Sequence, residues 1–533
     1  MLNKKTIFVS IIKIHIMKNL FILLAICITA TSFGQSVAIL DFNDVRAKVL
    51  SNGTLFDGTY EVPKPTINSG INSIYTSCFW IGGLDASSQL HIAAEIFGGA
   101  NKDFFFGPVA TNYTNPTYTS KYNKVWSVDR LAIQTHIANY TTPGYVVPAS
   151  IANWPSNGNV ANGEAAVLAP YVDVNTNGTY DPENGDYPCI RGDMAMFYMV
   201  NDDKQTHTAT GGAKLGIELH GMLYCYATND AINQQIFGHF TIYNRSATNY
   251  NNVYIGAFAD MDLGYYDDDY VGSDSLLNMF YTYNADNFDE DASGTLGYGA
   301  KPPAQGLMFL NQPISKFISF NSSSSTTGLP STALHYYQYL KGIWKDGTPL
   351  TQGGNGYGGV TPANFMFSGK PENFTGWTEG GAGMFAEDTR GLISTGPLNL
   401  PSGQMITLDV AYPFGWDNTG SNTSSVGLLR TNAQLAKDLY SFETFCSTLT
   451  GLNTQVIETN SPIIYPNPSN GKLFISNSNS IKLIEVYDII GHKILSIKNQ
   501  TINEIDLSNA PKGIYFVKLL IDNKLYTDKI IVE

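Results

Sequence analysis

The chain has 533 residues, of which 43% are hydrophobic and only 14% are charged, and its formal net charge is −14. This composition excludes a disordered chain and a multispanning membrane protein. The acidic charge also argues against a nucleic-acid partner, because phosphate groups would be repelled. With 32 Tyr and 50 Gly, the chain favours strands and turns over helices.

The first residues have the order of an export signal. A lysine follows Met17, residues 20–30 form an apolar run, and Ser32 and Gly34 are small. We expect translation to begin at Met17 and residues 1–35 to be a signal peptide that is cleaved after Gly34. The apolar run is too short to cross ~30 Å of hydrocarbon, and no later segment reaches the required length. We therefore expect no transmembrane segment in the mature chain.

Residues 36–452 form the expected body, a mainly β region of one or two domains. Frequent Asn-Gly and Asp-Gly pairs mark turns between short β-branched and aromatic runs. Segments 215–227, 235–244 and 253–260 predict three or four consecutive strands. No repeat of fixed period is present, so the pattern favours a β-sandwich-type body over a solenoid or propeller.

Two more elements are predicted near the end of the body. Segments 391–400 and 405–414 flank a turn at residues 401–404, which predicts a hairpin. Between residues 425 and 445, apolar residues recur at helical spacing and predict an amphipathic helix. We expect this helix to pack on the sheet and close the body, with a partner-binding face as the alternative.

Residues 173–181 match the first part of a calcium-binding loop. Oxygen-bearing side chains at alternate positions can wrap a hard cation, and Gly178 permits the sharp bend. The candidate ligands are Asp173, Asn175, Asn177, Thr179, Asp181 and Asp186. The twelfth position is Asn184 rather than an acidic residue, and no amphipathic helix flanks the loop. We expect a Ca²⁺-binding turn in a β-protein, with a metal-free turn rich in Asn and Asp as the alternative.

A second acidic segment follows the predicted strand at 253–260. Asp260 and Asp262 stand two apart at the strand end, so both carboxylates should point the same way. Three consecutive aspartates at 267–269 repel one another unless water or a cation neutralises them. The candidate Ca²⁺ ligands are Asp260, Asp262, Asp267, Asp269 and Asp274. A solvated acidic loop is the alternative.

The cysteines indicate structural rather than chemical roles. Cys27 lies in the export signal, which leaves Cys78, Cys189, Cys225 and Cys446 in the exported chain. Four thiols permit three pairings, and the sequence does not choose among them. No CxxC spacing indicates zinc or redox chemistry, so we expect structural disulfides or buried free thiols.

The last residues predict a small antiparallel β-sandwich after a linker at 453–462. Short alternating runs are separated by turns between residues 472 and 532. In order, the chain contains YPNPSNG, IEVYDIIGHKI, IDLSNAPKGIYFVKL and TDKIIVE. This set of blocks resembles the type A C-terminal sorting domain of type IX secretion cargo in Bacteroidota. The resemblance covers residues 463–533 and implies an Ig-like sandwich that the translocon reads and a sorting protease removes.

The body also resembles segments of uncharacterised Bacteroidota surface proteins. The similar segments are residues 154–158, the calcium-like stretch 168–188 and the acidic run 267–274. The export signal and the resemblance to a sorting domain imply a secreted or outer-membrane surface location, reached through the periplasm. It implies no particular activity.

No catalytic motif is evident in the body. HExxH, GxSxG, Walker and dinucleotide-binding patterns are absent, and His207, His220 and His239 are expected to be structural. The sequence therefore favours a calcium-stabilised protein for adhesion or for glycan or matrix binding over an enzyme. The alternative is a secreted polysaccharide-degrading hydrolase, since paired carboxylates can cleave glycosidic bonds.

Overall fold

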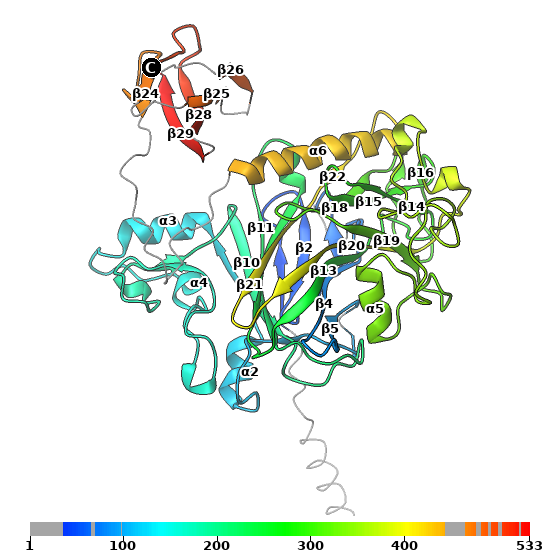
Figure 1. Cartoon of the computed structure of the whole chain (residues 1–533). Helices are drawn as coiled ribbons and strands as arrows, with labels where there is room; N and C mark the ends of the chain where they lie inside the picture. Colours follow the sequence, from blue (N-terminus) through cyan, green and yellow to red (C-terminus); the bar gives the residue numbers. More distant parts are fainter. Residues whose placement is uncertain are drawn as a thin grey trace, which may run out of the picture. The chain divides into compact units, whose positions relative to one another are not determined.

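The computed structural model describes residues 36–65, 70–97, 99–442, 464–475, 481–488, 492–498, 504–521 and 524–532. The chain divides into two compact units, Met1–Tyr440 and Ser441–Glu533 (Figure 1). The expected signal peptide, the expected linker and Cys446 lie outside the described residues.

Eight antiparallel strands form the first sheet of the body (Figure 1). In order across the sheet they are β1 (Val37–Leu40), β2 (Arg46–Leu50), β3 (Leu55–Glu61), β4 (Thr76–Leu84), β13 (Tyr250–Asp260), β20 (Thr389–Leu400) and β19 (Lys316–Asn321), and β5 (Leu90–Ala94) pairs with β4. Strands from the beginning, middle and end of the body are therefore neighbours in this sheet.

Ten strands form the second sheet. In order they are β14 (Asp269–Asp274), β15 (Met279–Asn284), β18 (Ala304–Phe309), β21 (Met405–Tyr412), β12 (Ile236–Asn244), β11 (Ile217–Cys225), β10 (Met194–Asn201) and β6 (Phe105–Phe106), while β22 (Phe414–Gly415) pairs with β18 and β7 (Trp126–Asp129) pairs with β10. The predicted strands at 215–227, 235–244 and 253–260 are confirmed as β11, β12 and β13.

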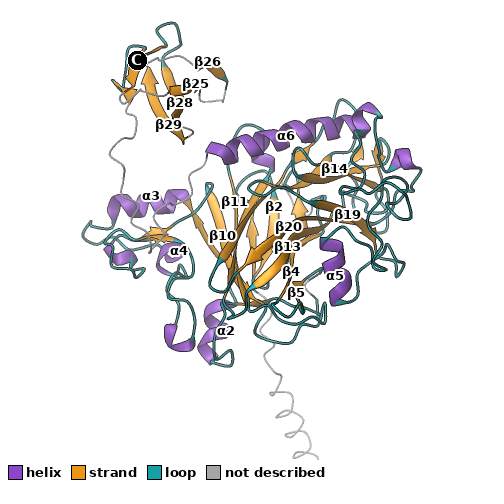
Figure 2. Cartoon of the chain, in the orientation of Figure 1, coloured by secondary structure: helices purple, strands orange, loops and turns teal. Residues whose placement is uncertain are grey.

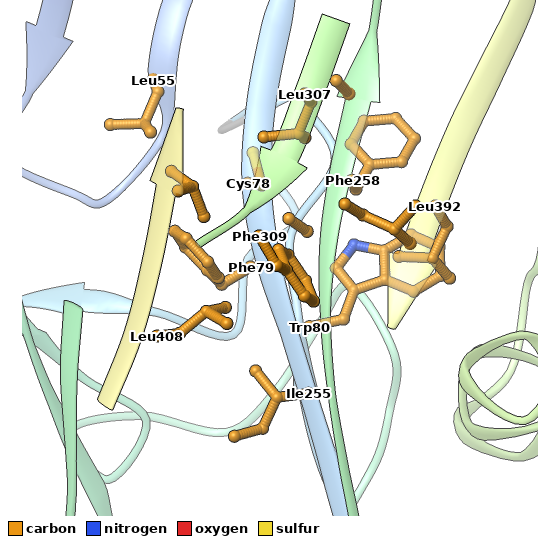
Figure 3. Packing of buried hydrophobic residues seen from close by; sticks show 14 of the residues in the cluster. Leu55, Cys78, Phe79, Trp80, Ile255, Phe258, Leu307, Phe309, Leu392 and Leu408 are labelled. Carbon is orange, nitrogen blue, oxygen red and sulfur yellow. The ribbon is translucent and has the colours of Figure 1, made fainter. Parts of the chain in front are cut away.

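The two sheets share one hydrophobic core, which confirms the β-sandwich-type body. Phe79 of β4 meets Phe240 of β12 across the core, with ring centroids 4.1 Å apart. The next residue, Trp80, points to the opposite side of β4 from Phe79 (Figure 3). The ring centroids of Trp80 and of Tyr336 in α5 (Ala333–Leu340) lie 4.8 Å apart. Almost all of β4 is buried because both faces of this strand are covered.

The predicted hairpin at 391–414 is wrong. β20 pairs with β13 and β19 in the first sheet, whereas β21 pairs with β12 and β18 in the second. The turn at 401–404 therefore carries the chain from one sheet to the other. Turn residues fix the reversal of the chain, but the buried faces of the flanking strands decide which sheet each one joins.

The predicted amphipathic helix is α6 (Asn422–Phe442), which begins about one turn earlier than expected; residues 443–445 of the prediction lie outside the described residues. Leu429, Ala433 and Ala436 are fully buried, whereas Leu428 and Leu435 are about two-fifths exposed, at 37% and 40%. The buried face is therefore narrower than the predicted apolar stripe. Leu429 packs directly on the backbone of Gly415 in β22.

Shorter elements surround the sandwich (Figure 2). The helices are α2 (Pro116–Tyr122), α3 (Arg130–Asn139) and α4 (Ala149–Ala152), with single 3₁₀ turns η1 (Val160–Asn162), η2 (Pro182–Asn184), η3 (Ala231–Gln234), η4 (Pro371–Asn373) and η5 (Gly380–Ala382). Two small hairpins pair β8 (Tyr171–Val172) with β9 (Tyr187–Pro188) and β16 (Phe288–Asp289) with β17 (Gly299–Ala300).

The C-terminal unit is a second, smaller sandwich. One sheet has the order β23 (Ile464–Tyr465), β24 (Lys472–Ile475) and β27 (Glu504–Asp506), and the other has β26 (Lys493–Lys498), β25 (Ile481–Asp488), β28 (Gly513–Ile521) and β29 (Lys524–Val532). Alternate residues of these strands meet in a separate hydrophobic core. The predicted alternating runs are thus confirmed as strands.

The described cysteines have two different states. Cys78 and Cys225 are free and buried in the core, whereas Cys189 is disulfide-bonded. Two buried thiols exclude any arrangement in which all four cysteines of the exported chain are paired.

Candidate metal centre

The carboxylates of Asp260, Asp262 and Asp388 come together where β13 ends and β20 begins. Asp260 is the last residue of β13 and lies opposite Arg390 of β20 in the antiparallel register. Asp262 follows two residues later, and Asp388 directly precedes β20. One carboxylate oxygen of each lies within 4.8 Å of the others. This group, the carboxylate triad, is close enough for its members to share one cation.

Arg390 neutralises part of the triad. Its Nε lies 3.2 Å from Oδ2 of Asp260, and its Nη2 lies 2.9 Å from Oδ2 of Asp388. The other oxygen of Asp260 is buried and has no hydrogen-bond partner. Three carboxylates beside one guanidinium leave an excess of two negative charges. A divalent cation with oxygen ligands, such as Ca²⁺, would balance that excess.

Asp260 and Asp262 of the triad resist ionisation when no cation is bound. Burial, and then the charge of Asp262, raises the pKa of Asp260 well above its usual range. Burial, and then the charge of Asp388, raises the pKa of Asp262 to about 7. A cation would replace the protons held here, because carboxylates must be ionised to bind a metal.

The first predicted calcium loop lies between β8 and β9 and is closed by hydrogen bonds. The carboxylate of Asp181 accepts hydrogen bonds from the side-chain amides of Asn175, Asn177 and Asn184 at 3.1, 2.9 and 2.9 Å. Asp173 accepts two backbone N–H groups of the turn at 3.2 and 2.7 Å. The structure therefore brings four of the predicted ligands into one loop.

Asp186 and Thr179, the other two predicted ligands, also form hydrogen bonds within this loop. Asp186 is fully buried, and its two oxygens accept the backbone N–H groups of Val174 and Asp181 at 2.8 and 2.9 Å. Burial raises the pKa of Asp186. Thr179 donates its backbone N–H to the side-chain oxygen of Asn177 at 2.8 Å. Asp186 thus stabilises the backbone conformation of the loop through these two hydrogen bonds.

The remaining predicted residues occupy three different environments. Asp267 is exposed. Asp269 is buried, and its Oδ2 accepts the backbone N–H of Leu263 at 3.1 Å. Asp274 forms an ion pair with Arg430 of α6. Asp274 therefore joins sheet and helix, and the structure does not bring it into the triad.

Two exposed aromatic side chains border the triad. Tyr75 is 39% exposed and Phe97 is 42% exposed, and their ring centroids lie 6.2 Å apart. The guanidinium of Arg390 lies 6.0 Å from the centroid of Phe97. Burial, and then the charges of Asp57 and of Asp262 in the triad, raise the pKa of Tyr75. Aromatic faces beside carboxylates and a guanidinium can hold a flat ligand and bond its hydroxyl groups.

Sequence reasoning did not find Asp388 and Arg390. Both lie far along the chain from Asp260, and only the pairing of β13 with β20 brings them together. The available signal was an acidic and a basic residue on either side of Thr389, at the start of a long β run.

A further acidic pair lines a small cavity beside β19. Glu379, Glu387 and Trp344 are among the residues around a volume of about 60 Å³. Burial raises the pKa of Glu379 to about 8, and its carboxylate accepts the backbone N–H of Val271 at 2.6 Å. Such a space holds about two water molecules. It is too small for a sugar ring and does not form a hydrolase cleft.

A larger polar pocket lies beside η3 and α6. Its volume is about 540 Å³, and Asp44, Asp230, Trp416 and Leu428 are among its lining residues. Trp416 is the aromatic residue in this lining. The pocket is a second surface on which a polar ligand could rest.

The fold and these sites define a class of protein: an acidic β-sandwich body with candidate cation sites, followed by a small accessory sandwich. Among the described residues, no helix is long and apolar enough to cross a membrane. The accessory sandwich has its own core and shares none of the acidic groups described above.

The family model for the secretion system C-terminal sorting domain matches residues 463–533. The C-terminal unit is therefore a sorting domain of the type IX secretion system, as its sequence blocks predicted. The chain interacts with that machinery and is exported to the cell surface or the extracellular space.

The comparisons give little information on the body. No curated protein sequence matches the chain. Among solved structures, a polysaccharide lyase aligns over 59% of this chain and 34% of its own length, with 7% identity and a TM-score of 0.19. The aligned part thus spans about a third of that lyase, and so low a score carries no argument about the body.

Proposed function

We propose that the body binds glycan or matrix polymers outside the cell, through Tyr75, Phe97 and the carboxylate triad, and that Ca²⁺ stabilises this surface. The observation that carries the proposal is the position of two exposed aromatic rings beside the triad and Arg390. After export, the translocon and its sorting protease would act on residues 463–533 and leave the body at the surface.

The chemistry of the surface suits a polyhydroxylated ligand. Exposed aromatic rings cover the apolar faces of sugar rings, while carboxylates accept hydrogen bonds from hydroxyl groups. A Ca²⁺ ion shared by the triad would hold the carboxylates ionised and fixed. It could also take sugar hydroxyl oxygens as ligands, since Ca²⁺ accepts six to eight oxygens.

The test compares binding of polysaccharides by the secreted chain and by its variants. In Ca²⁺, the double variant Tyr75→Ala, Phe97→Ala should bind at least about tenfold more weakly, a loss of about 1.4 kcal/mol. Phe374→Ala is the matched control, because Phe374 is an exposed aromatic residue outside this surface, at 89% exposure. Chelation should weaken binding by the unaltered chain.

Two outcomes would overturn the proposal. The first is equal binding by the double variant and the control. The second is binding that survives the double variant but is lost in Trp416→Ala, which would move the ligand to the larger pocket.

A polysaccharide-degrading hydrolase is the second candidate. The specific observation is Asp262, a partly buried carboxyl whose pKa is raised to about 7 beside two other carboxylates. A carboxylic acid protonated near neutral pH can act as the general acid in glycoside cleavage. Release of reducing ends that is lost in Asp262→Asn would support this candidate. No release from a broad set of polysaccharides would exclude it.

A further inference from the structure

His207 is a buried histidine in the segment that joins β10 to β11 of the second sheet. This segment, residues 202–216, runs beside β5, which pairs with β4 in the first sheet. Ile92 of β5 donates its N–H to the carbonyl oxygen of Ala213 at 3.0 Å. The side chain of His207 is 0% exposed, so its two ring nitrogens depend on protein groups for their hydrogen bonds.

Both ring nitrogens of His207 face a main-chain carbonyl group. Nδ1 lies 2.8 Å from the carbonyl oxygen of Ile92, and Nε2 lies 2.8 Å from that of Asp202. A carbonyl oxygen can only accept a hydrogen bond, so each nitrogen must donate one. A neutral imidazole carries one N–H, whereas the imidazolium carries two. The two hydrogen bonds can therefore form together only when the ring is protonated.

Asp202 supplies one of two buried carboxylates beside this ring. Its Oδ2 lies 3.6 Å from Nε2 of His207 and accepts the N–H of Leu215 at 2.6 Å, while its Oδ1 accepts the N–H of Ile217 at 2.7 Å. Burial raises the pKa of Asp202 to about 6, and the charge of His207 acts against this rise. The carboxyl group is therefore ionised at neutral pH and ties the end of β10 to the start of β11.

Asp103 supplies the second carboxylate, next to the other ring nitrogen. Its Oδ2 lies 3.8 Å from Nδ1 of His207. That oxygen accepts the N–H of Ala94 at 3.2 Å and the hydroxyl of Thr210 at 2.6 Å. The other oxygen accepts the N–H of Ala209 at 3.0 Å. Asp103 thus joins the end of β5 to the segment that carries His207.

His207 is the one cation that pairs with these two carboxylates among the described residues. The other charged and titratable groups around them are Glu95, Lys102, Tyr113, Asp203, Tyr250 and Tyr336. Lys102 is the only further cation in this set, and it is partly exposed. Without the ring proton, two buried carboxylates would lie beside a neutral ring, and one carbonyl group would lose its donor. Burial of uncompensated charge strongly destabilises a fold.

The same contacts fix both ends of the stretch that carries Phe97. Residues 95–102 follow β5 and end at Asp103. His207 holds β5 at Ile92, before this stretch, and Asp103 closes the stretch by accepting the N–H of Ala94. Phe97 is one of the two exposed aromatic residues of the proposed glycan surface. His207 thus holds the base from which that ring projects.

We propose that His207 is an imidazolium clasp between the two sheets, and that release of its proton to water at alkaline pH opens the clasp and loosens residues 95–102. A histidine that must be protonated in the folded state contributes stability at low pH and loses this contribution as the pH rises. The clasp is therefore closed at about pH 6 and opens toward about pH 9. Its effect on glycan binding rests on the function proposed above, whereas the clasp itself does not.

The test measures amide hydrogen exchange of the secreted chain by mass spectrometry at pH 6 and pH 9, corrected for the intrinsic pH dependence of exchange. In the unaltered chain, peptides from residues 90–103 and 202–216 should exchange at least about tenfold faster at pH 9, because the clasp opens locally. His207→Gln should exchange equally fast at both pH values, since glutamine carries no charge. His492→Gln is the matched control, because the His492 side chain is 74% exposed.

Glu95→Gln separates the clasp from a neighbouring carboxyl group. Burial, and then the charge of Asp103, raises the pKa of Glu95 to about 8, so Glu95 also ionises within this pH range. Exchange in Glu95→Gln should keep its pH dependence. Loss of the pH dependence in Glu95→Gln, or its persistence in His207→Gln, would overturn the proposal.

If His207→Gln does not fold, nitrogen NMR of the unaltered chain labelled at histidine provides the test. At about pH 7.5, where free histidine is neutral, a ring with a proton on both nitrogens should be present and should disappear as residues 90–103 begin to exchange. Neutral rings alone at that pH would overturn the proposal. Glycan binding that stays constant from pH 6 to 9 while exchange changes would leave the clasp standing and separate it from the proposed function.

Discussion

Arg390→Gln is the most informative single change in the body, because it removes the one cation that the triad carries. The Arg390 side chain is 9% exposed and the Asp260 side chain 3%, so their 3.2 Å ion pair is buried. Removal of one partner from a buried pair costs about 3–5 kcal/mol, because the other charge remains uncompensated.

Protonation of Asp260 sets a ceiling on that cost. Protonation at pH 7 of an aspartate with an unfolded-state pKa near 3.9 lowers the free energy of unfolding by about 4 kcal/mol, at 1.36 kcal/mol per pH unit. We therefore expect Arg390→Gln to lose at most about 3–4 kcal/mol at pH 7 in chelator, because Asp260 already has a raised pKa beside Arg390. The loss should shrink as the pH falls and should vanish below about pH 3, where Asp260 is protonated in both the folded and the unfolded state.

The assay is urea unfolding followed by tryptophan fluorescence, since all six tryptophans lie in the body. Lys48→Gln is the control, because Lys48 pairs with Asp57 at 3.1 Å on the surface and should cost less than about 1 kcal/mol. A loss in Arg390→Gln no larger than in the control, or one that does not depend on pH, would refute the reasoning. Added Ca²⁺ should recover part of the loss if the triad binds it.

Three other results are expected. Burial, and then the charge of Asp103, raises the pKa of Glu95 to about 8. The contribution of Glu95 to the stability of the fold is therefore present below pH ~4.3 and is lost as the pH rises through 8. Glu95→Gln should flatten this decline of the melting temperature between pH 5 and 9. Phe79→Ala should lower the free energy of unfolding by about 3–5 kcal/mol in urea titrations, since its ring fills the space between the sheets. Cys78 and Cys225 should not react with a thiol reagent until the body unfolds, because burial raises both pKa values.

The sequence predicted the elements of the fold better than their arrangement. Runs of β-branched and aromatic residues identified β11, β12 and β13, whose residues are mostly buried. Alternating runs identified the strands of the sorting domain, because side-chain alternation reflects burial of one face. The pairing of β20 and β21 with different sheets left no local trace, since residues 401–404 form a tight turn in either case. The apolar stripe of α6 was predicted too wide because Leu428 and Leu435 remain partly exposed.

The candidate sites show the same limit. Residues two apart on a strand end, such as Asp260 and Asp262, could be placed on one side from the period of a β-strand. Asp388 and Arg390 could not, because only the sheet register brings them to the triad. The sequence does not indicate which of the neighbouring residues Asp267 and Asp268 has a buried carboxylate. The structure exposes the first and buries both oxygens of the second.

The position of the acidic groups follows from the topology. A β-sandwich needs segments that leave one sheet and enter the other, and such a segment has few neighbours to satisfy its polar groups. Residues 261–268 are such a segment, with the triad at the end of β13 and the buried carboxylates of Asp268 and Asp269 at the start of β14. A cation at the triad would fix the carboxylates at the end of β13, while Met261 and Leu263 hold the segment in the core. If the triad binds Ca²⁺ as we propose, part of the acidic charge of the chain would serve as its ligands.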